Sequence, residues 1–120
     1  MGTQLPKTTA AIEQAAGYRP CVFRPPYGAQ DRSVVDTALS QNLTTIVWDV
    51  DPADWSRPGM GAIISNVLAN ARNGSIVLMH DGGGPRGETL AALPAIIDTL
   101  RARGYGFVTV PELLGYSNTY

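Results

Sequence analysis

Histidine and cysteine are almost absent from this sequence. The chain of 120 residues has one histidine, His80, and one cysteine, Cys21. A single histidine cannot form a histidine-rich metal centre, because a zinc site takes at least three protein ligands. A lone cysteine cannot form a disulfide within the chain, and a buried thiol is its commoner fate. Cysteine usage therefore leaves both the redox compartment and the fate of Cys21 open.

The sequence also lacks an excess of one charge and any long apolar run. Nine basic residues stand against ten acidic ones, for a net charge of −1. Without a basic stripe to attract a phosphate backbone, nucleic acid is excluded as an expected partner. Apolar runs such as 76–79 are far shorter than the roughly 20 residues of a membrane span. No charged and apolar pair of segments opens the sequence, so we expect no signal peptide within it.

Helix-like and strand-like segments alternate along the chain. Apolar residues at helical spacing, capping residues and terminal glycines predict helices over about 6–16, 31–42, 60–72 and 88–103. Runs rich in β-branched and aromatic residues predict strands over 21–24, 44–50, 75–79 and 106–110, before a short turn or helix at 111–114. This alternation is typical of parallel strands with helical crossovers. We therefore predict a single α/β domain over residues 1–120, with about four parallel strands. That number suffices for a partial (β/α) barrel or a small open sheet, but not for a closed barrel.

Three polar motifs follow the predicted strands at their carboxyl ends, where α/β folds collect functional residues. The first is Arg24-Pro-Pro-Tyr27-Gly28. A fixed guanidinium there can hold a carboxylate, and the turn can direct a backbone N–H at a developing oxyanion. A structural turn with a surface arginine explains the same residues, so both interpretations stay open.

Three aspartates, Asp49, Asp51 and Asp54, lie in the second motif beside Trp55. Burying a carboxylate is costly unless it is paired or hydrogen-bonded, so these groups need partners. One of them could orient a histidine while Trp55 forms the wall of an apolar pocket. Capping and turn formation are the alternative role, natural for an aspartate before proline or in a tight loop.

His80 ends the third predicted strand and is followed by Asp81 and three glycines. Imidazole suits general acid catalysis near neutral pH, and a neighbouring carboxylate would hold it protonated. A structural histidine is the alternative, and a metal role is disfavoured because no second histidine or cysteine cluster exists. The loop 82–84 could also hold a phosphate, although its spacing fits neither nucleotide-binding glycine pattern.

Together, Arg24-Pro-Pro-Tyr27, Asp51-Pro-Ala-Asp54-Trp55 and Leu78-Met-His80-Asp81 resemble three ordered motifs of the polysaccharide deacetylase family, the NodB-like carbohydrate esterase family 4. The resemblance extends over about residues 8–113. It implies a distorted (β/α) barrel that removes acetyl groups from chitin oligomers, peptidoglycan or xylan. It also implies a divalent metal, usually zinc, held by one aspartate and two histidines.

The resemblance assigns a role to each candidate residue. Arg24 resembles the arginine that steadies the catalytic base, and the backbone N–H of Tyr27 resembles the group that helps to bind the oxyanion. Asp54 resembles the carboxylate that orients the catalytic acid, and His80 resembles that acid. Trp55 and Leu78 resemble the walls of the pocket that takes the acetyl methyl, and Asp51 belongs to its motif in a supporting role.

Two motifs of the family, an Asp-Asp pair and a His-x-x-x-His segment, are absent from this sequence. In the family they supply the base and all three metal ligands, so we expect this chain to be the C-terminal half of such a domain and inactive alone. Exposed strand edges would pair with the missing N-terminal half or with a second copy. By family analogy we expect the parent enzyme to be secreted or in the cell envelope. The rival hypotheses are a non-catalytic carbohydrate-binding or assembly module, and an unrelated open sheet that binds phosphate through residues 82–84.

Overall fold

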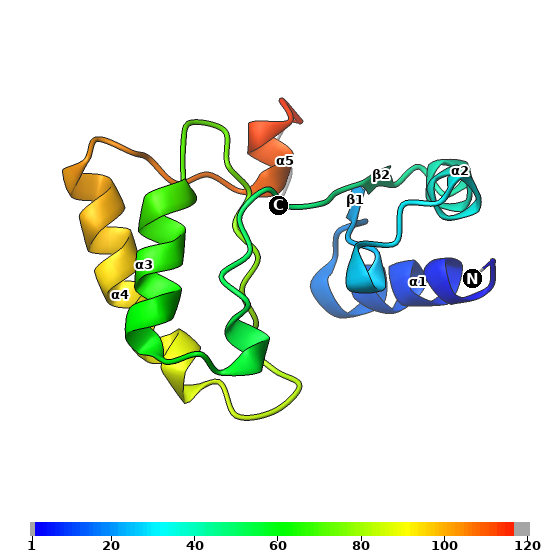
Figure 1. Ribbon diagram of the computed structural model, residues 1–120. Helices are drawn as coiled ribbons and strands as arrows, with labels where there is room; N and C mark the ends of the chain where they lie inside the picture. Colours follow the sequence, from blue (N-terminus) through cyan, green and yellow to red (C-terminus); the bar gives the residue numbers. More distant parts are fainter. Residues whose placement is uncertain (1, 117–120) are drawn as a thin grey trace. The chain divides into compact units, whose positions relative to one another are not determined.

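The computed structural model describes residues 2–116 and consists of two compact units (Figure 1). Of the described residues, 2–47 and 109–116 form the first unit, and 48–108 form the second. Helices and parallel pairing of extended backbone occur in each of them. The predicted α/β class is therefore confirmed, whereas the grouping of the whole chain into one domain stays a prediction.

The first unit contains a parallel strand pair joined by a helix. Strand β1 (Val22–Phe23) pairs with β2 (Thr44–Thr45), and helix α2 (Arg32–Ser40) lies between them in the chain. Parallel strands need such a crossover, since a tight turn can join only antiparallel neighbours. Helix α1 (Gln4–Ala16) precedes β1 (Figure 1).

Local sequence signals fix the helix ends in this unit. The Asp31 carboxylate accepts the N–H of Val34 at 3.0 Å and caps α2, which satisfies one of the amide groups left unpaired at a helix start. Gly17 ends α1 with a left-handed φ of 75°, a conformation that costs glycine nothing. The helices then cover a small core of Leu5, Ala38 and Leu43, with Phe23 packed against it.

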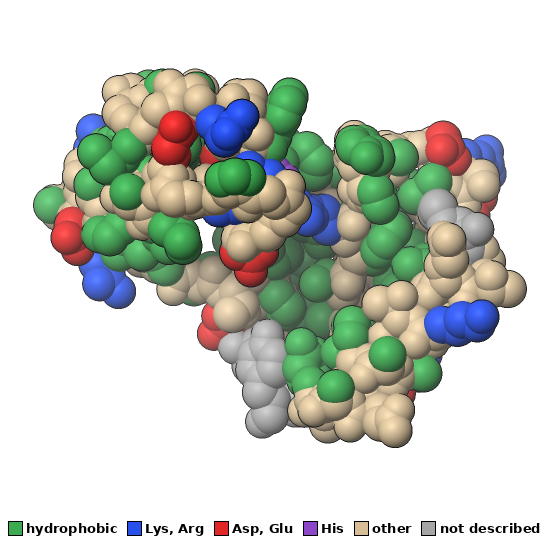
Figure 2. Space-filling model, turned by 90° about the horizontal axis from the view of Figure 1, so that it is seen from below, with side chains coloured by type: hydrophobic (Ala, Val, Ile, Leu, Met, Phe, Trp, Pro, Cys, Tyr) green, Lys and Arg blue, Asp and Glu red, His purple; other side chains and the backbone are tan. Residues whose placement is uncertain are grey.

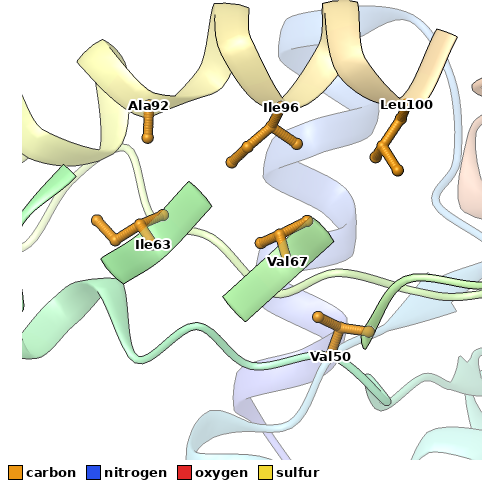
Figure 3. Close-up of a cluster of buried hydrophobic side chains, with 6 residues drawn as sticks. All are labelled: Val50, Ile63, Val67, Ala92, Ile96 and Leu100. Carbon is orange, nitrogen blue, oxygen red and sulfur yellow. The ribbon is translucent and has the colours of Figure 1, made fainter. Parts of the chain in front are cut away.

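The second unit is built on two packed helices. Helices α3 (Met60–Asn70) and α4 (Gly87–Ala102) lie side by side, and their apolar faces meet in the core (Figures 1 and 3). Beneath them, residues 48–50 and 76–78 run parallel: Leu78 donates to the carbonyl of Val50 at 2.9 Å, and Val50 bridges to Val77. Six side chains from these three layers make the core: Val50, Ile63, Val67, Ala92, Ile96 and Leu100.

Polar contacts tie α3 to α4 near both ends. The carboxylate of Glu88, in the first turn of α4, accepts the backbone N–H of Gly59 at 2.8 Å. At the other end, the Arg103 guanidinium donates to the carbonyl of Leu68 at 2.6 Å. The start of α4 is thus fixed relative to the loop that precedes α3, and this loop carries the second motif.

The prediction of four strands is not confirmed. Residues 106–109 lack regular structure, and α5 (Val110–Leu113) begins at the last residue of the predicted strand 106–110. The Thr109 hydroxyl accepts the N–H of Glu112, whose carboxylate accepts the N–H of Thr109. This capping box favours a helix start at the place where side-chain pattern alone favoured a strand.

The other predicted strands are shorter than the sequence pattern indicated. Regular pairing covers two residues in each of β1 and β2, and between 44–50 and 75–79 a single bridge joins Val50 to Val77. A strand is defined by hydrogen bonds to a neighbour, and apolar pattern reports burial rather than the partner. The pattern thus located extended backbone correctly and overestimated its pairing.

Both units expose apolar side chains (Figure 2). Phe107 is 52% exposed and Val108 63%, just before α5. Over residues 2–116, no helix combines the length and the apolar character that crossing a bilayer requires.

Candidate active site

A short strained turn places Asp54 in the interior of the second unit. The helix η2 (Asp54–Ser56) is flanked by Ala53 and Arg57, both left-handed, with φ of 51° and 57°. Such φ values are unfavourable for residues with a Cβ atom, and at functional sites they often hold a side chain in place. The Asp51 carboxylate accepts the N–H of Ala53 at 2.8 Å, so Asp51 forms the turn that leads into Asp54.

Both carboxylate oxygens of Asp54 are engaged, although the residue is 1% exposed. Oδ1 lies 2.7 Å from Nδ1 of His80. Oδ2 accepts the backbone N–H of His80 and the hydroxyl of Thr89, each at 2.8 Å. A buried carboxylate persists only with such partners, because desolvation without them costs several kcal/mol.

These contacts also determine the charge of Asp54. Burial by itself would raise the pKa of the Asp54 carboxyl, but the hydrogen bonds from His80 and Thr89 outweigh it and hold the pKa below its ordinary value of 3.8. Asp54 is therefore ionised near neutral pH. A carboxylate accepts and cannot donate, so Nδ1 of His80 carries the proton in this pair.

His80 is held on one side and accessible on the other. Its backbone N–H and Nδ1 both contact Asp54, whereas Nε2 makes no hydrogen bond to any residue in the range 2–116. The His80 side chain is 27% exposed. With Nδ1 fixed by a buried carboxylate, Nε2 is the atom that can exchange a proton with a substrate.

Asp49 has a different role from Asp54. Its carboxylate accepts the N–H of Ile76 at 2.7 Å and the hydroxyl of Ser75 at 2.9 Å, and it lies 3.8 Å from the Arg72 guanidinium. Burial by itself would raise the pKa of the Asp49 carboxyl, but these hydrogen bonds and the nearby arginine together outweigh it and hold the pKa below its ordinary value of 3.8. Asp49 therefore holds residues 75–76 in position rather than contributing to the Asp54 and His80 pair.

Sequence reasoning missed Thr89. Thr89 lies in the first turn of α4, is 5% exposed, and donates to Asp54. The buried positions of α4 follow the spacing 89, 92, 96 and 100. A threonine on an otherwise apolar helix face needs an acceptor, so this break in the apolar face was the signal that could have revealed it.

Arg86 organises the glycine loop after His80. Its guanidinium donates to the carbonyls of Gly82 at 2.9 Å and Gly83 at 3.2 Å, and more weakly to those of Pro85 and Trp55. The loop carbonyls thus accept hydrogen bonds from the guanidinium of Arg86. This side chain explains the conformation of the loop without a bound phosphate.

The remaining candidate residues lie at three kinds of position. Leu78 is buried, at 8% exposure, and Trp55 is 58% exposed on η2. Arg24 and Tyr27 belong to the first unit, where the fully exposed Tyr27 occupies a left-handed conformation at φ 56° inside η1 (Pro26–Gly28). The structure thus brings Asp54 and His80 together, and the convergence of Arg24 and Tyr27 on the same cleft stays a prediction.

The described part of the chain does not offer a metal site. Among residues 2–116, no group of three histidine, cysteine, aspartate or glutamate side chains is placed to hold an ion. Both oxygens of the most buried carboxylate, Asp54, already accept hydrogen bonds. Within the range 2–116, the side chains therefore do not fit a resident metal.

The sequence is similar to several curated deacetylases. A peptidoglycan-N-acetylglucosamine deacetylase of Bacillus cereus is 46% identical over 101 residues, a match that covers 82% of this chain and 47% of that protein. A chitooligosaccharide deacetylase of Sinorhizobium fredii is 41% identical over 100 residues, with 75% of this chain and 46% of the relative covered. The chain thus spans less than half the length of these relatives. No protein-family model matches it.

Solved structures give the same result. A peptidoglycan N-acetylglucosamine deacetylase superposes with a TM-score of 0.90 at 35% identity, over 98% of this chain and 55% of that one. A pseudoenzyme of carbohydrate esterase family 4 from Bacillus anthracis gives 0.86 at 36% identity, over 94% and 39%. A family 4 carbohydrate esterase from Streptomyces lividans gives 0.79 at 35% identity, over 90% and 55%. With these similarities in sequence and fold, the chain belongs to carbohydrate esterase family 4, the polysaccharide deacetylases.

Proposed function

We propose that this chain supplies the general acid and oxyanion groups of a metal-dependent deacetylase that removes acetyl groups from a polysaccharide. The observation that carries the proposal is the buried Asp54 carboxylate, 2.7 Å from Nδ1 of a histidine whose Nε2 makes no hydrogen bond within residues 2–116. Hydrolysis of an amide or ester requires that the leaving nitrogen or oxygen gain a proton. His80 donates that proton from Nε2, and the Asp54 carboxylate stabilises the imidazolium by its opposite charge.

The other candidate residues complete the proposed site. The left-handed turn at Tyr27 would direct a backbone N–H to the tetrahedral oxyanion, and Arg24 would hold the catalytic base of the intact enzyme. Trp55 and Leu78 would enclose the acetyl methyl. The divalent metal, zinc by family resemblance, would be held by residues outside this sequence.

The relatives support the substrate class. Two of the similar proteins are named for peptidoglycan and chitooligosaccharide deacetylation, so we propose an acetylated amino-sugar polymer as the substrate. For a peptidoglycan substrate, the parent enzyme acts outside the cytoplasm, in the cell envelope or as a secreted protein.

A non-catalytic role is the second candidate. It is favoured by the absence of a three-ligand cluster among residues 2–116 and by the similarity to a family 4 pseudoenzyme. In that case, the chain would bind or assemble on carbohydrate and keep the Asp54 and His80 pair for structural reasons alone.

Reconstitution separates the two candidates. The chain is mixed with a polypeptide that carries the Asp-Asp and His-x-x-x-His motifs, zinc is added, and acetate release from an acetylated chitin oligomer is measured. We expect activity that His80→Ala abolishes and that Asp54→Asn lowers by about 10²-fold or more, the usual contribution of a positioned acid. Asp81→Asn, at an exposed position beside the site, is the matched control and should retain activity. Carbohydrate binding without acetate release would support the non-catalytic candidate.

A further inference from the structure

We propose that Thr89 is a positioning residue, which holds the Asp54 carboxylate ionised and in the orientation that fixes His80. The Thr89 hydroxyl donates to Oδ2 of Asp54 at 2.8 Å, and both residues are buried. Thr89 contacts Asp54 and not the His80 ring, so it acts on the imidazole through the carboxylate. The inference rests on the proposed function only where it calls His80 the acid.

The geometry gives the hydroxyl a specific task. Oδ2 accepts two donors, from the His80 backbone and from Thr89, while Oδ1 faces the imidazole. The His80 backbone N–H comes from the same residue that the carboxylate must orient. Thr89 comes instead from α4, whose core packing on α3 is independent of the pair. Thr89 therefore ties the carboxylate to a helix that packs in the core of the unit.

The charges around Asp54 are few. His80 is the group that pairs with it, and no lysine or arginine among residues 2–116 lies within ion-pair distance of its oxygens. Asp81, next in the chain, is exposed. A buried anion without a permanently charged cation beside it depends on hydrogen bonds from neutral donors. The Thr89 hydroxyl is such a donor, and a valine at this position removes it while keeping the shape of the side chain.

The test is a titration of the Asp54 carboxyl by ¹³C NMR of the full chain, with the resonance assigned by its loss in Asp54→Asn. Thr89→Val replaces the hydroxyl by a methyl of similar size, and Thr89→Ser keeps the hydroxyl. We expect the carboxyl pKa to rise by about one unit in Thr89→Val, because one hydrogen bond to a charged group is removed. Thr89→Ser should titrate like the wild-type chain.

Two outcomes overturn the proposal: a folded Thr89→Val that titrates like the wild type, or an equal rise in Thr89→Ser. A merely structural threonine would lower the unfolding midpoint of Thr89→Val and leave the titration unmoved. Thr89→Ala takes the place of the valine variant if that variant does not fold. If neither variant folds, the pKa of the Asp54 carboxyl in the wild-type chain is the test. A value at or above the ordinary 3.8 would refute the inference.

The single histidine makes a second readout direct, since every imidazole resonance of the chain belongs to His80. In the wild type we expect the neutral ring to carry its proton on Nδ1. In Thr89→Val we expect the ratio of the Nδ1-protonated to the Nε2-protonated tautomer to fall about tenfold, because the carboxylate is held less firmly. Acetate release in the reconstituted enzyme is measured separately. Inactivity of all variants with the NMR pattern intact would refute the proposed function and leave this inference standing.

Discussion

Replacing Asp54 by asparagine tests the electrostatic argument for the site. The asparagine oxygen can keep the donors from His80 N–H and Thr89, and its amide would then face Nδ1 of His80 as a donor. The shape is retained and the charge is lost. A hydrogen bond to a charged group contributes about 1 kcal/mol more than a neutral one, so three such bonds predict a loss of about 3 kcal/mol in the free energy of unfolding.

The loss should depend on pH in one direction. The folded pKa of Asp54 lies below its ordinary value of 3.8, so its stabilising contribution is fully present above that pH and is lost as the pH falls through the lowered pKa. The difference between wild type and Asp54→Asn is therefore largest near neutral pH and shrinks as the pH approaches the folded pKa. Asp49, whose pKa is also lowered, contributes equally to both proteins and cancels in the comparison.

Urea unfolding followed by circular dichroism, at about pH 7 and about pH 3, measures this difference. Asp81→Asn, which removes an exposed carboxylate, is the matched control and should change the unfolding free energy by less than about 0.5 kcal/mol. An Asp54→Asn loss no larger than that of the control at neutral pH would refute the reasoning. So would a loss of about 3 kcal/mol that stays constant down to the acid limit of folding.

Three further predictions follow from the same structure. Ala53→Gly should stabilise the chain by about 0.5–1 kcal/mol in thermal unfolding, because φ is 51° at this residue and left-handed backbone suits glycine. Glu88→Ala should lower the urea midpoint by an amount equivalent to about 1 kcal/mol, since it removes the bond to the Gly59 N–H. Sedimentation of the chain alone should show self-association, because apolar residues such as Phe107 and Val108 are exposed beside backbone without strand pairing.

Each of these has a control. Ala91→Gly, at an exposed position inside α4, should destabilise by about 1 kcal/mol, and a like effect at Ala53 would contradict the backbone argument. Glu88→Gln keeps an acceptor oxygen and should recover most of the lost midpoint. A stable monomer in sedimentation at high concentration would contradict the prediction of self-association.

The sequence by itself predicted the helices, the family and the association of Asp54 with His80. Helix ends followed from Asp31 and Gly17, because capping is a contact between neighbours in the chain. The motifs around Asp54 and His80 carried the family resemblance, and similarity to known deacetylases then showed the family. Short motifs in a fixed order can identify a family from the sequence alone, because the comparison does not require knowledge of how the side chains pack.

Only the tertiary structure decided how the three aspartates differ and which residue supports them. Asp49, Asp51 and Asp54 are alike in sequence, and their partners come from residues 75–76, Ala53, and His80 with Thr89. Thr89 lies 35 residues from Asp54 in the chain, and nothing local connects them. The extent of strand pairing was beyond the sequence for the same physical reason: a hydrogen bond between distant segments depends on which backbone lies beside them, and side-chain pattern records burial but not the neighbour.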